Sequence, residues 1–287
     1  MATEQPNARG RLATITGTTV VRYAVLLIAV ALIFFPLLWM VSTAVKPSRA
    51  LGQFPPSIFP ANPTLTPIIE AFQTGLWGRW FLNTFIISAG TTLAVLAVTV
   101  PTAYALARKD FLGKKPLYLG IVALLIFPAQ ILLLPLYIQF SSLNLIGTYI
   151  GLILVYTVLF SAFVVFLLYG FFQTLPSDVE DAARVADISE LKLFLRVILP
   201  LAKPAIGIAA IFVFVFSWNE YLWALVFLDR NSMFTISVGL TFFEGNHGQI
   251  VMNQMMGMSI LASIPVLLLF AFTQERFIQG IVTGYEF

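Results

Sequence analysis

Six long apolar segments follow one another along the chain, each separated from the next by a polar stretch. They span residues 23–44, 82–107, 117–140, 149–172, 205–228 and 255–272. A helix needs about 20 mostly apolar residues to cross the hydrocarbon core of a membrane, and an open strand there would leave backbone groups without hydrogen bonds. The pattern therefore predicts an all-α membrane protein with six transmembrane helices in a single domain over residues 1–287.

The first segment is too long to be the core of a secretory signal peptide. Its apolar run of about 22 residues exceeds the 7–15 residues usual for such a core, and no small-residue cleavage site follows it. We therefore expect residues 23–44 to be retained as a membrane helix.

Prolines mark both the apolar segments and one of the polar stretches. Proline in a membrane helix frees a carbonyl group and kinks the helix, which serves packing, shapes a cavity or permits movement. Pro101, Pro128, Pro135 and Pro265 are among the prolines that lie inside predicted helices. Residues 45–81 are also proline-rich, and we expect an extended loop there with one short helix at 68–74.

Composition agrees with a chain whose solvent is mainly lipid. Hydrophobic residues make up 59% of the chain and charged residues only 10%, whereas a soluble domain has about 25% charged residues to cover its surface. No polar stretch is long enough to form a soluble domain of its own. The composition therefore favours one multi-pass domain in contact with membrane lipid.

The lysines and arginines are divided unequally between alternating polar stretches. Only four of the 16 lie in the stretches that follow the first, third and fifth apolar segments, namely Lys46, Arg49, Arg79 and Arg230. Basic residues concentrate on the cytoplasmic side of membrane proteins, so we expect both termini and residues 173–204 to be cytoplasmic. The net charge of +3 is then explained by topology, and no nucleic-acid partner is expected.

The sequence also excludes several kinds of active site. It contains no G-x-x-x-x-G-K-[ST] nucleotide-binding motif and no H-E-x-x-H metal motif. His247 is the only histidine and there is no cysteine, so thiol catalysis, disulfides and thiolate metal sites are ruled out. We expect this chain to be neither an enzyme nor the holder of a metal or cofactor.

Residues 173–204 form a charged stretch between the fourth and fifth apolar segments. Asp178, Glu180 and Asp181 follow Ser177, as acidic residues do in the first turn of a helix. Residues 187–190, Asp-Ile-Ser-Glu, match a capping box in which the first acid starts a second helix. Apolar residues then recur at helical spacing, namely Leu191, Phe194, Leu195 and Ile198. The stretch predicts a short helix, a turn and an amphipathic helix at the inner membrane surface, and a merely interfacial helix is the alternative.

Residues 180–200, EDAARVADISELKLFLRVILP, resemble the E-A-A loop of ATP-binding-cassette (ABC) importer permeases. The matching positions are Glu180, Ala182, Ala183, Ile198, Leu199 and Pro200. The chain departs from the family at Asp187, which stands where the family has glycine, and at Ala186, where aspartate is common. Aspartate tolerates the left-handed backbone better than most residues, so we expect the turn to persist.

Other segments resemble the carbohydrate-uptake subgroup of that family, and in particular the second permease of maltose-type sugar importers. They are residues 81–88, 103–115, 214–228, 234–249 and 263–284. The resemblance implies a type I ABC importer permease with six helices, located in a bacterial or archaeal cytoplasmic membrane. It implies three partners: a sister permease, a dimeric ATP-binding-cassette ATPase that hydrolyses ATP with Mg, and an extracytoplasmic solute-binding protein.

The resemblance also implies that the cytoplasmic loop docks on the ATPase subunit through a coupling helix. The residues assigned to this coupling are Glu180, Asp181, Ala182, Ala183, Ala186, Asp187, Ser189, Leu199 and Pro200.

Glu220 is the one acidic residue well inside a predicted transmembrane helix, where a carboxylate is costly and usually functional. Its neighbours combine aromatic faces with an amide, which suits a sugar. The candidates for the substrate pathway are Trp218, Asn219, Glu220, Tyr221 and Trp223, with Gln130, Asn253 and Gln254 as weaker ones. The alternative is that Trp223 lies at the membrane interface and Glu220 pairs with a partner helix.

Two other classes of function remain as alternatives. A secondary transporter often shows inverted repeats and several charges inside the membrane, and this chain shows one acid and no repeat. A membrane-embedded enzyme or assembly protein would need a catalytic group that the sequence lacks. Within the importer hypothesis, a glycerol-phosphate-type polyol is the alternative cargo.

Overall fold

The computed structural model describes residues 17–74, 76–185, 187–241 and 251–283, and these form helices, turns and loops without a strand. The four longest helices are α1 (Gly17–Ala44), α3 (Trp77–Arg108), α6 (Tyr149–Thr174) and α13 (Met252–Thr283). Each contains a stretch long and apolar enough to cross a membrane. They cover the first, second, fourth and sixth predicted segments, and Pro101 and Pro265 lie inside α3 and α13 without ending them.

The third predicted segment differs from the expectation of one continuous helix over 117–140. The structure has α4 (Lys114–Ala123), a 3-10 turn (Ala129–Leu132) and α5 (Leu133–Ser142) instead. Pro128 precedes the 3-10 turn with an extended backbone. Proline lacks an amide hydrogen and disfavours helical backbone in the residue before it, which explains why the helix is interrupted here.

The fifth predicted segment is also broken. Helix α10 (Lys203–Asn219) ends before Glu220, whose backbone is extended, and the short helix α11 (Leu222–Phe227) follows. On the other side, residues 190–201 meet α10 at a bend of 74°. By length and composition, the described residues therefore supply four membrane-crossing helices, or five if this bent pair counts as one, and the expected six are not reached.

The remaining elements are short. They comprise a 3-10 turn at Ser48–Ala50, α2 (Thr66–Thr74), α7 (Asp178–Val185), α8 (Glu190–Leu193), a π-helical turn at Phe194–Ile198, α9 (Leu199–Leu201), a 3-10 turn at Asn231–Met233 and α12 (Ile236–Thr241). Helix α2 confirms the short helix expected in the proline-rich stretch.

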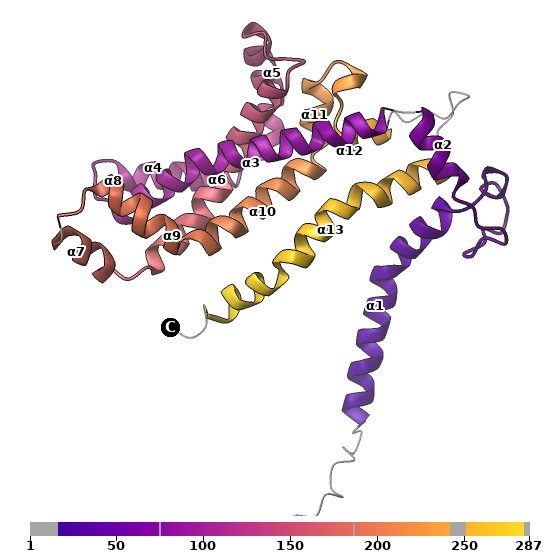
Figure 1. The fold of residues 1–287 in the computed structure, drawn as a ribbon, viewed down its shortest axis with the longest axis horizontal. Coiled ribbons are helices and arrows are strands. Elements are labelled where there is room, and N and C mark those ends of the chain that lie inside the picture. Colours follow the sequence, from indigo (N-terminus) through magenta and orange to yellow (C-terminus); the bar gives the residue numbers. More distant parts are fainter. Residues whose placement is uncertain (1–16, 75, 186, 242–250, 284–287) are drawn as a thin grey trace, which may run out of the picture.

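Helices α3, α6 and α10 form the body of the molecule, as Figure 1 shows, with α13 running beside α10. We call the end of this body that carries α7–α9 the inner end, and the end that carries α11 and α12 the outer end. One hydrophobic core joins α3, α6 and α10 towards the inner end, and it includes Leu106, Leu168, Phe172, Leu193 and Ile198. A second core at the outer end includes Ile87, Leu152, Tyr156, Trp223 and Phe227.

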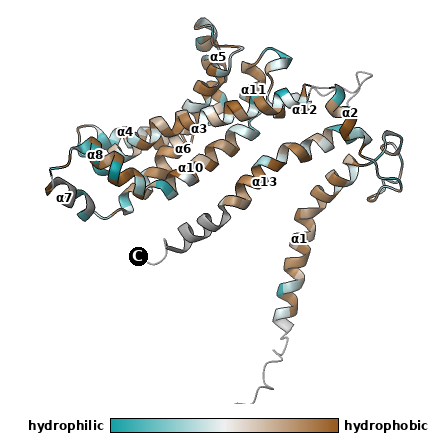
Figure 2. Ribbon diagram, viewed as in Figure 1, coloured by the Kyte–Doolittle hydropathy of each residue, from teal (hydrophilic) through white to brown (hydrophobic). Residues whose placement is uncertain are grey.

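Helix α1 departs from this body. The C-terminal end of α1 lies against α13, and towards its N-terminus α1 diverges from the body. No residue of its most apolar 18-residue stretch is buried within the chain. Figure 2 shows hydrophobic residues along most of its length. An apolar helix in this position needs lipid or another protein around it.

Candidate functional site

The inner loop, residues 173–204, folds as a short helix, a turn and a bent helical run. Helix α7 begins at Asp178, and the carbonyl group of Ser177 accepts hydrogen bonds from the backbone amides of Glu180 (2.9 Å) and Asp181 (3.0 Å). Asp187 adopts the left-handed conformation, with φ of 55°, so the expected turn is present with aspartate in place of glycine.

The second half of the loop departs from the predicted capping box. Helix α8 begins at Glu190, its N-cap is Ser189, and the side chain of Ser189 makes no capping hydrogen bond. Asp187 is in the left-handed turn, whereas an N-cap residue has extended backbone. The box therefore does not form as predicted, and Glu190 instead binds Lys109.

The predicted apolar stripe is also rotated. Leu193 and Ile198 are buried, whereas Leu191 and Leu195 are 68% and 49% exposed. A π-helical turn at Phe194–Ile198 interrupts the regular helical spacing on which the predicted stripe rests.

Glu180 points into the protein and forms an ion pair with Arg108, the last residue of α3. Its Oε1 atom lies 2.8 Å from Nε of Arg108, and the two side chains are only 5% and 14% exposed. A buried carboxylate is costly unless it is paired and hydrogen-bonded. Glu180, one of the predicted coupling residues, is thus buried and bound to another residue of the same chain.

Lys109, next to Arg108, forms a second ion pair with Glu190 on the other side of the Asp187 turn. Burial by itself lowers the pKa of Lys109, but the hydrogen bond with Glu190 and the neighbouring Tyr104 outweigh it, so the pKa is raised. Lys109 therefore stays charged at physiological pH. Its Nζ atom also lies 5.4 Å from the ring centre of Tyr104, within cation–π range.

The solvent-exposed surface of the inner loop carries acidic residues around apolar side chains. Asp178, Asp181 and Asp187 are exposed, Val185 is 89% exposed and Ile188 is 38% exposed. The other predicted coupling positions are spread over the loop: Ala182 and Ala183 belong to α7, Ser189 is exposed, Leu199 and Pro200 begin α9, and Ala186 lies outside the described residues.

At the outer end, Glu220 lies in the break between α10 and α11, and its side chain stabilises the chain there. Its Oε1 accepts a hydrogen bond from the amide of Trp223, and its Oε2 accepts one from the amide of Ala224, both at 3.0 Å. The hydroxyl of Tyr156 on α6 donates to Oε2 at 2.6 Å. The carboxylate thereby caps α11, since the first amides of a helix have no partner within it.

The aromatic neighbours of Glu220 differ in burial. Trp223 is 3% exposed and packs in the outer core beside Phe227. Trp218 is buried as well, and its Nε1 donates to the carbonyl group of Ala262 at 3.1 Å. Tyr221, by contrast, is 38% exposed.

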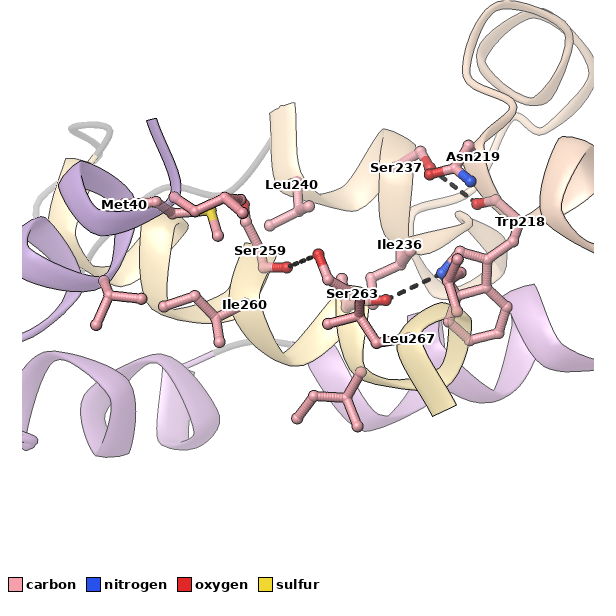
Figure 3. Close-up of a pocket in the computed structure, with 15 residues that line it drawn as sticks. Met40, Trp218, Asn219, Ile236, Ser237, Leu240, Ser259, Ile260, Ser263 and Leu267 are labelled. Atoms are coloured by element: carbon pink, nitrogen blue, oxygen red, sulfur yellow. Dashed lines mark hydrogen bonds between the residues drawn. The ribbon is translucent and has the colours of Figure 1, made fainter. Parts of the chain in front are cut away.

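A cavity of about 590 Å³ lies beside this break, between α1, α10, α12 and α13. Figure 3 shows Trp218 and Asn219 at one side of it and the hydroxyls of Ser237, Ser259 and Ser263 along it. The rest of its lining is apolar. A largely apolar cavity with a few polar groups is typical of a small-molecule site.

The weaker candidates lie elsewhere. Asn253 donates to the carbonyl group of Lys46 at 2.7 Å, and Gln254 donates to Glu70 at 3.0 Å, so both tie the start of α13 to the outer loop that follows α1. Gln130 is exposed in the 3-10 turn of the broken third segment and does not line the cavity. His247 lies outside the described residues.

Two groups of residues were not singled out from the sequence. Arg108 and Lys109 served only as evidence for orientation. Asn83, buried in α3, binds the loop before α12: its Nδ2 donates to the carbonyl groups of Ser232 and Phe234, both at 3.0 Å. A polar Asn-Thr pair at the start of the second apolar segment was the available signal for this second group.

Thr84 and Trp80 complete this attachment of α3 to α12. The hydroxyl of Thr84 accepts a hydrogen bond from the amide of Ile236 at 2.7 Å, and Nε1 of Trp80 donates to the carbonyl group of Asn231 at 2.8 Å. A Cβ atom on Gly239 would lie 2.3 Å from the ring of Trp80. Only glycine therefore lets α12 approach α3 this closely.

Comparison with known proteins gives consistent matches over most of the chain. Residues 99–281 match the family described as binding-protein-dependent transport system inner membrane component. The arabinooligosaccharides transport system permease protein AraQ of Halalkalibacterium halodurans is 33% identical over 253 residues, covering 87% of this chain and 90% of the relative. The sulfoquinovosyl glycerol transport system permease protein SmoH of Agrobacterium fabrum is 30% identical over 250 residues, covering 87% of each.

The fold is also similar to a solved structure. A chain from the crystal structure of a bacterial ABC transporter involved in the import of the acidic polysaccharide alginate superposes with a TM-score of 0.80 at 20% identity. The match covers 90% of this chain and 95% of the other. The arrangement of helices is therefore that of an ABC importer membrane subunit.

Proposed function

The chain belongs to the family of binding-protein-dependent transport system inner membrane components, the non-catalytic membrane subunits of ABC importers, and we propose that its cargo is a sugar or sugar-like solute. The names of two relatives, which transport arabinooligosaccharides and sulfoquinovosyl glycerol, support this cargo class. In this proposal the chain forms half of the pathway, and a sister permease forms the other half.

The lining of the cavity beside α10 supports a neutral carbohydrate as the cargo. This lining offers an indole, an amide and serine hydroxyls, and none of the lining residues that the structure describes is a lysine or arginine. A phosphorylated polyol would call for a cation, so we favour a sugar over a glycerol-phosphate-type polyol. Asn219 and Tyr221 are the exposed members of the Glu220 cluster, and we assign them the cargo-facing role.

The single observation that carries the coupling role is the exposed tip of the inner loop. Val185, at the end of α7, is 89% exposed and has Asp181 and Asp187 nearby in sequence. A solvated loop gains nothing from an exposed apolar tip, whereas a docking surface buries it. We propose that this tip enters a cleft of the ATPase dimer whose rim carries basic residues.

The exposed apolar surface of α1 supports contact with lipid and the sister permease. The distribution of lysine and arginine supports an orientation with the inner end and both termini in the cytoplasm. The outer end would then meet the extracytoplasmic solute-binding protein.

The proposal is tested by reconstituting the complete transporter in proteoliposomes with arabinooligosaccharides as the first probe. Uptake should require ATP on the ATPase side and the binding protein on the other. Uptake driven by an ion gradient without the ATPase would contradict the proposal and favour a secondary transporter.

The coupling role is tested by Val185→Glu, which places a charge at the tip. We expect the ATPase to be lost from the purified complex and uptake to fall at least ~10-fold, because an unpaired charge in an interface is costly. The matched control is Leu112→Glu, since Leu112 is fully exposed in the turn after α3. Equal effects of the two changes would contradict docking through α7.

A further inference from the structure

The C-terminal end of α3 binds the inner loop on both sides of the Asp187 turn. Arg108 binds Glu180 on α7, before the turn, and Lys109 binds Glu190 on α8, after it. These two neighbouring cations thus bridge Asp187, which among the described residues of the loop is the one with left-handed backbone. The arrangement fixes the angle at which α7 leaves the body.

The two ion pairs are unequal. The Arg108–Glu180 pair is almost entirely withdrawn from solvent, with side chains 14% and 5% exposed. The Lys109–Glu190 pair is 29% and 58% exposed. Solvent and salt weaken exposed ion pairs more than buried ones. Arg108 is therefore the principal contact and Lys109 a supporting one.

An aromatic cluster braces the same junction. The ring of Tyr104, one turn before Arg108, lies 5.7 Å from Phe172 at the end of α6 and 5.1 Å from Phe194 in the π-helical turn. The ends of α3 and α6 and the start of the bent run are thereby packed together. Within this junction, α7 is joined to α3 by the Arg108–Glu180 pair.

Helix α3 also reaches the opposite end of the molecule. Its 32 residues extend from this junction to the outer end, where Asn83 holds the loop before α12. Figure 1 shows α3 running along the whole body between α8 and α12. A displacement delivered to its inner end can thus reach the outer loop through one continuous helix.

We propose that Arg108 is the positioning residue that transmits movement from the coupling tip to α3. In this role Glu180 acts inside the chain, as the attachment point of α7, and the exposed residues around Val185 meet the motor. The inference rests on the proposed function of the loop. It assigns to α3 the task of carrying the movement outward.

The test is Arg108→Gln in the complete transporter, with Lys115→Gln as the matched control because Lys115 is an exposed cation just beyond α3. We expect the Arg108→Gln complex to retain its ATPase subunits and hydrolyse ATP, while solute transported per ATP falls at least ~10-fold. Lys115→Gln should match the wild type. Wild-type coupling in Arg108→Gln, or equal losses in both variants, would overturn the inference.

A double variant separates a paired role from two independent ones. In Arg108→Gln/Glu180→Gln the buried pair becomes two amides, which keep a hydrogen bond without a lone charge. The double variant should lose about as much coupling as either single variant, because the two residues act as one unit. Losses that multiply would overturn the proposal, as would a double variant that couples normally while neither single variant does.

A readout independent of transport keeps this inference distinct from the proposed function. The chain has no cysteine, so Asp178→Cys, at the exposed start of α7 and away from the Val185 tip, provides the only spin-label site in this chain. In the purified complex, Arg108→Gln should increase the mobility of this label and Lys115→Gln should not. An unchanged spectrum in Arg108→Gln would overturn the inference, even in a complex whose uptake supports the proposed function.

Discussion

The carboxylate of Glu220 is expected to stabilise the break between α10 and α11, and Glu220→Gln tests this directly. Two oxygens of Glu220 accept from three donors, namely the amides of Trp223 and Ala224 and the hydroxyl of Tyr156. Glutamine has the same length but only one acceptor oxygen. Its NH₂ group must therefore face at least one of these donors, and the negative charge at the start of α11 is lost.

The magnitude follows from these contacts. A hydrogen bond to a charged group contributes about 1.5–3 kcal/mol, and a negative charge at a helix N-terminus about 0.3–1 kcal/mol. Losing one such bond and the charge should lower the free energy of unfolding by roughly 2–4 kcal/mol. Tyr156→Phe removes one hydrogen bond and keeps the capping charge, so its effect should be smaller and in the same direction.

The assay is denaturant unfolding of the purified complex followed by tryptophan fluorescence, to which Trp223 beside the break contributes. Asn219→Ala is the control for the unfolding measurement alone, because its amide donates within α10, to the carbonyl group of Val215, whereas its uptake is expected to change through the cargo-facing role. Uptake should fall in parallel for Glu220→Gln and Tyr156→Phe. A stability loss for Glu220→Gln below about 0.6 kcal/mol, the average for a hydrogen bond between membrane helices, would refute the reasoning. Altered solute selectivity without a stability loss would point to cargo contact instead.

Two further predictions concern the attachment of α12 to α3. Asn83→Ala removes two bonds to the loop before α12 and one from the hydroxyl of Tyr149. At up to ~1.7 kcal/mol per bond, we expect the free energy of unfolding to fall by roughly 2–5 kcal/mol. A loss under about 0.6 kcal/mol, the average for one such bond, would contradict this expectation. Gly239→Ala places a methyl group against Trp80 and should cost about 1–3 kcal/mol through overpacking, measured as a lower melting temperature of the complex. Gly207→Ala is the control, since open space surrounds Gly207, and equal melting temperatures for the two alanine variants would contradict the steric argument.

The helices that the sequence predicts best are those whose apolar run is both long and continuous. Helix α6 begins at Tyr149, where Thr148 accepts a hydrogen bond from the amide of Gly151 as its N-cap, and the apolar pattern begins at the same place. The presence of a proline does not by itself decide whether a helix stops: Pro101 lies inside α3, whereas the helix before Pro128 is interrupted. Neighbouring helices can satisfy the backbone groups that a proline frees, and hydropathy does not record which neighbours are present.

The candidate site likewise has some features that the sequence predicts and others that it does not. The left-handed turn at Asp187 could be expected from a family pattern and from the local properties of aspartate. The inward direction of Glu180 could not, because its partner Arg108 is 72 residues away in the sequence. The break at Glu220 lies within a segment that hydropathy predicts as one continuous helix, and its stabilisation depends on Tyr156, 64 residues earlier.

By itself, the sequence determines a helical membrane chain, the positions of the long helices and a charged inner loop with a turn at Asp187. These follow from local properties, since hydropathy and length decide whether a segment suits lipid, and backbone preference decides where it turns. Only the tertiary structure decides which charges pair, where the third and fifth segments break, and how α3 joins the inner loop to the outer one. Those features depend on contacts between residues far apart in the chain, and packing alone brings such residues together.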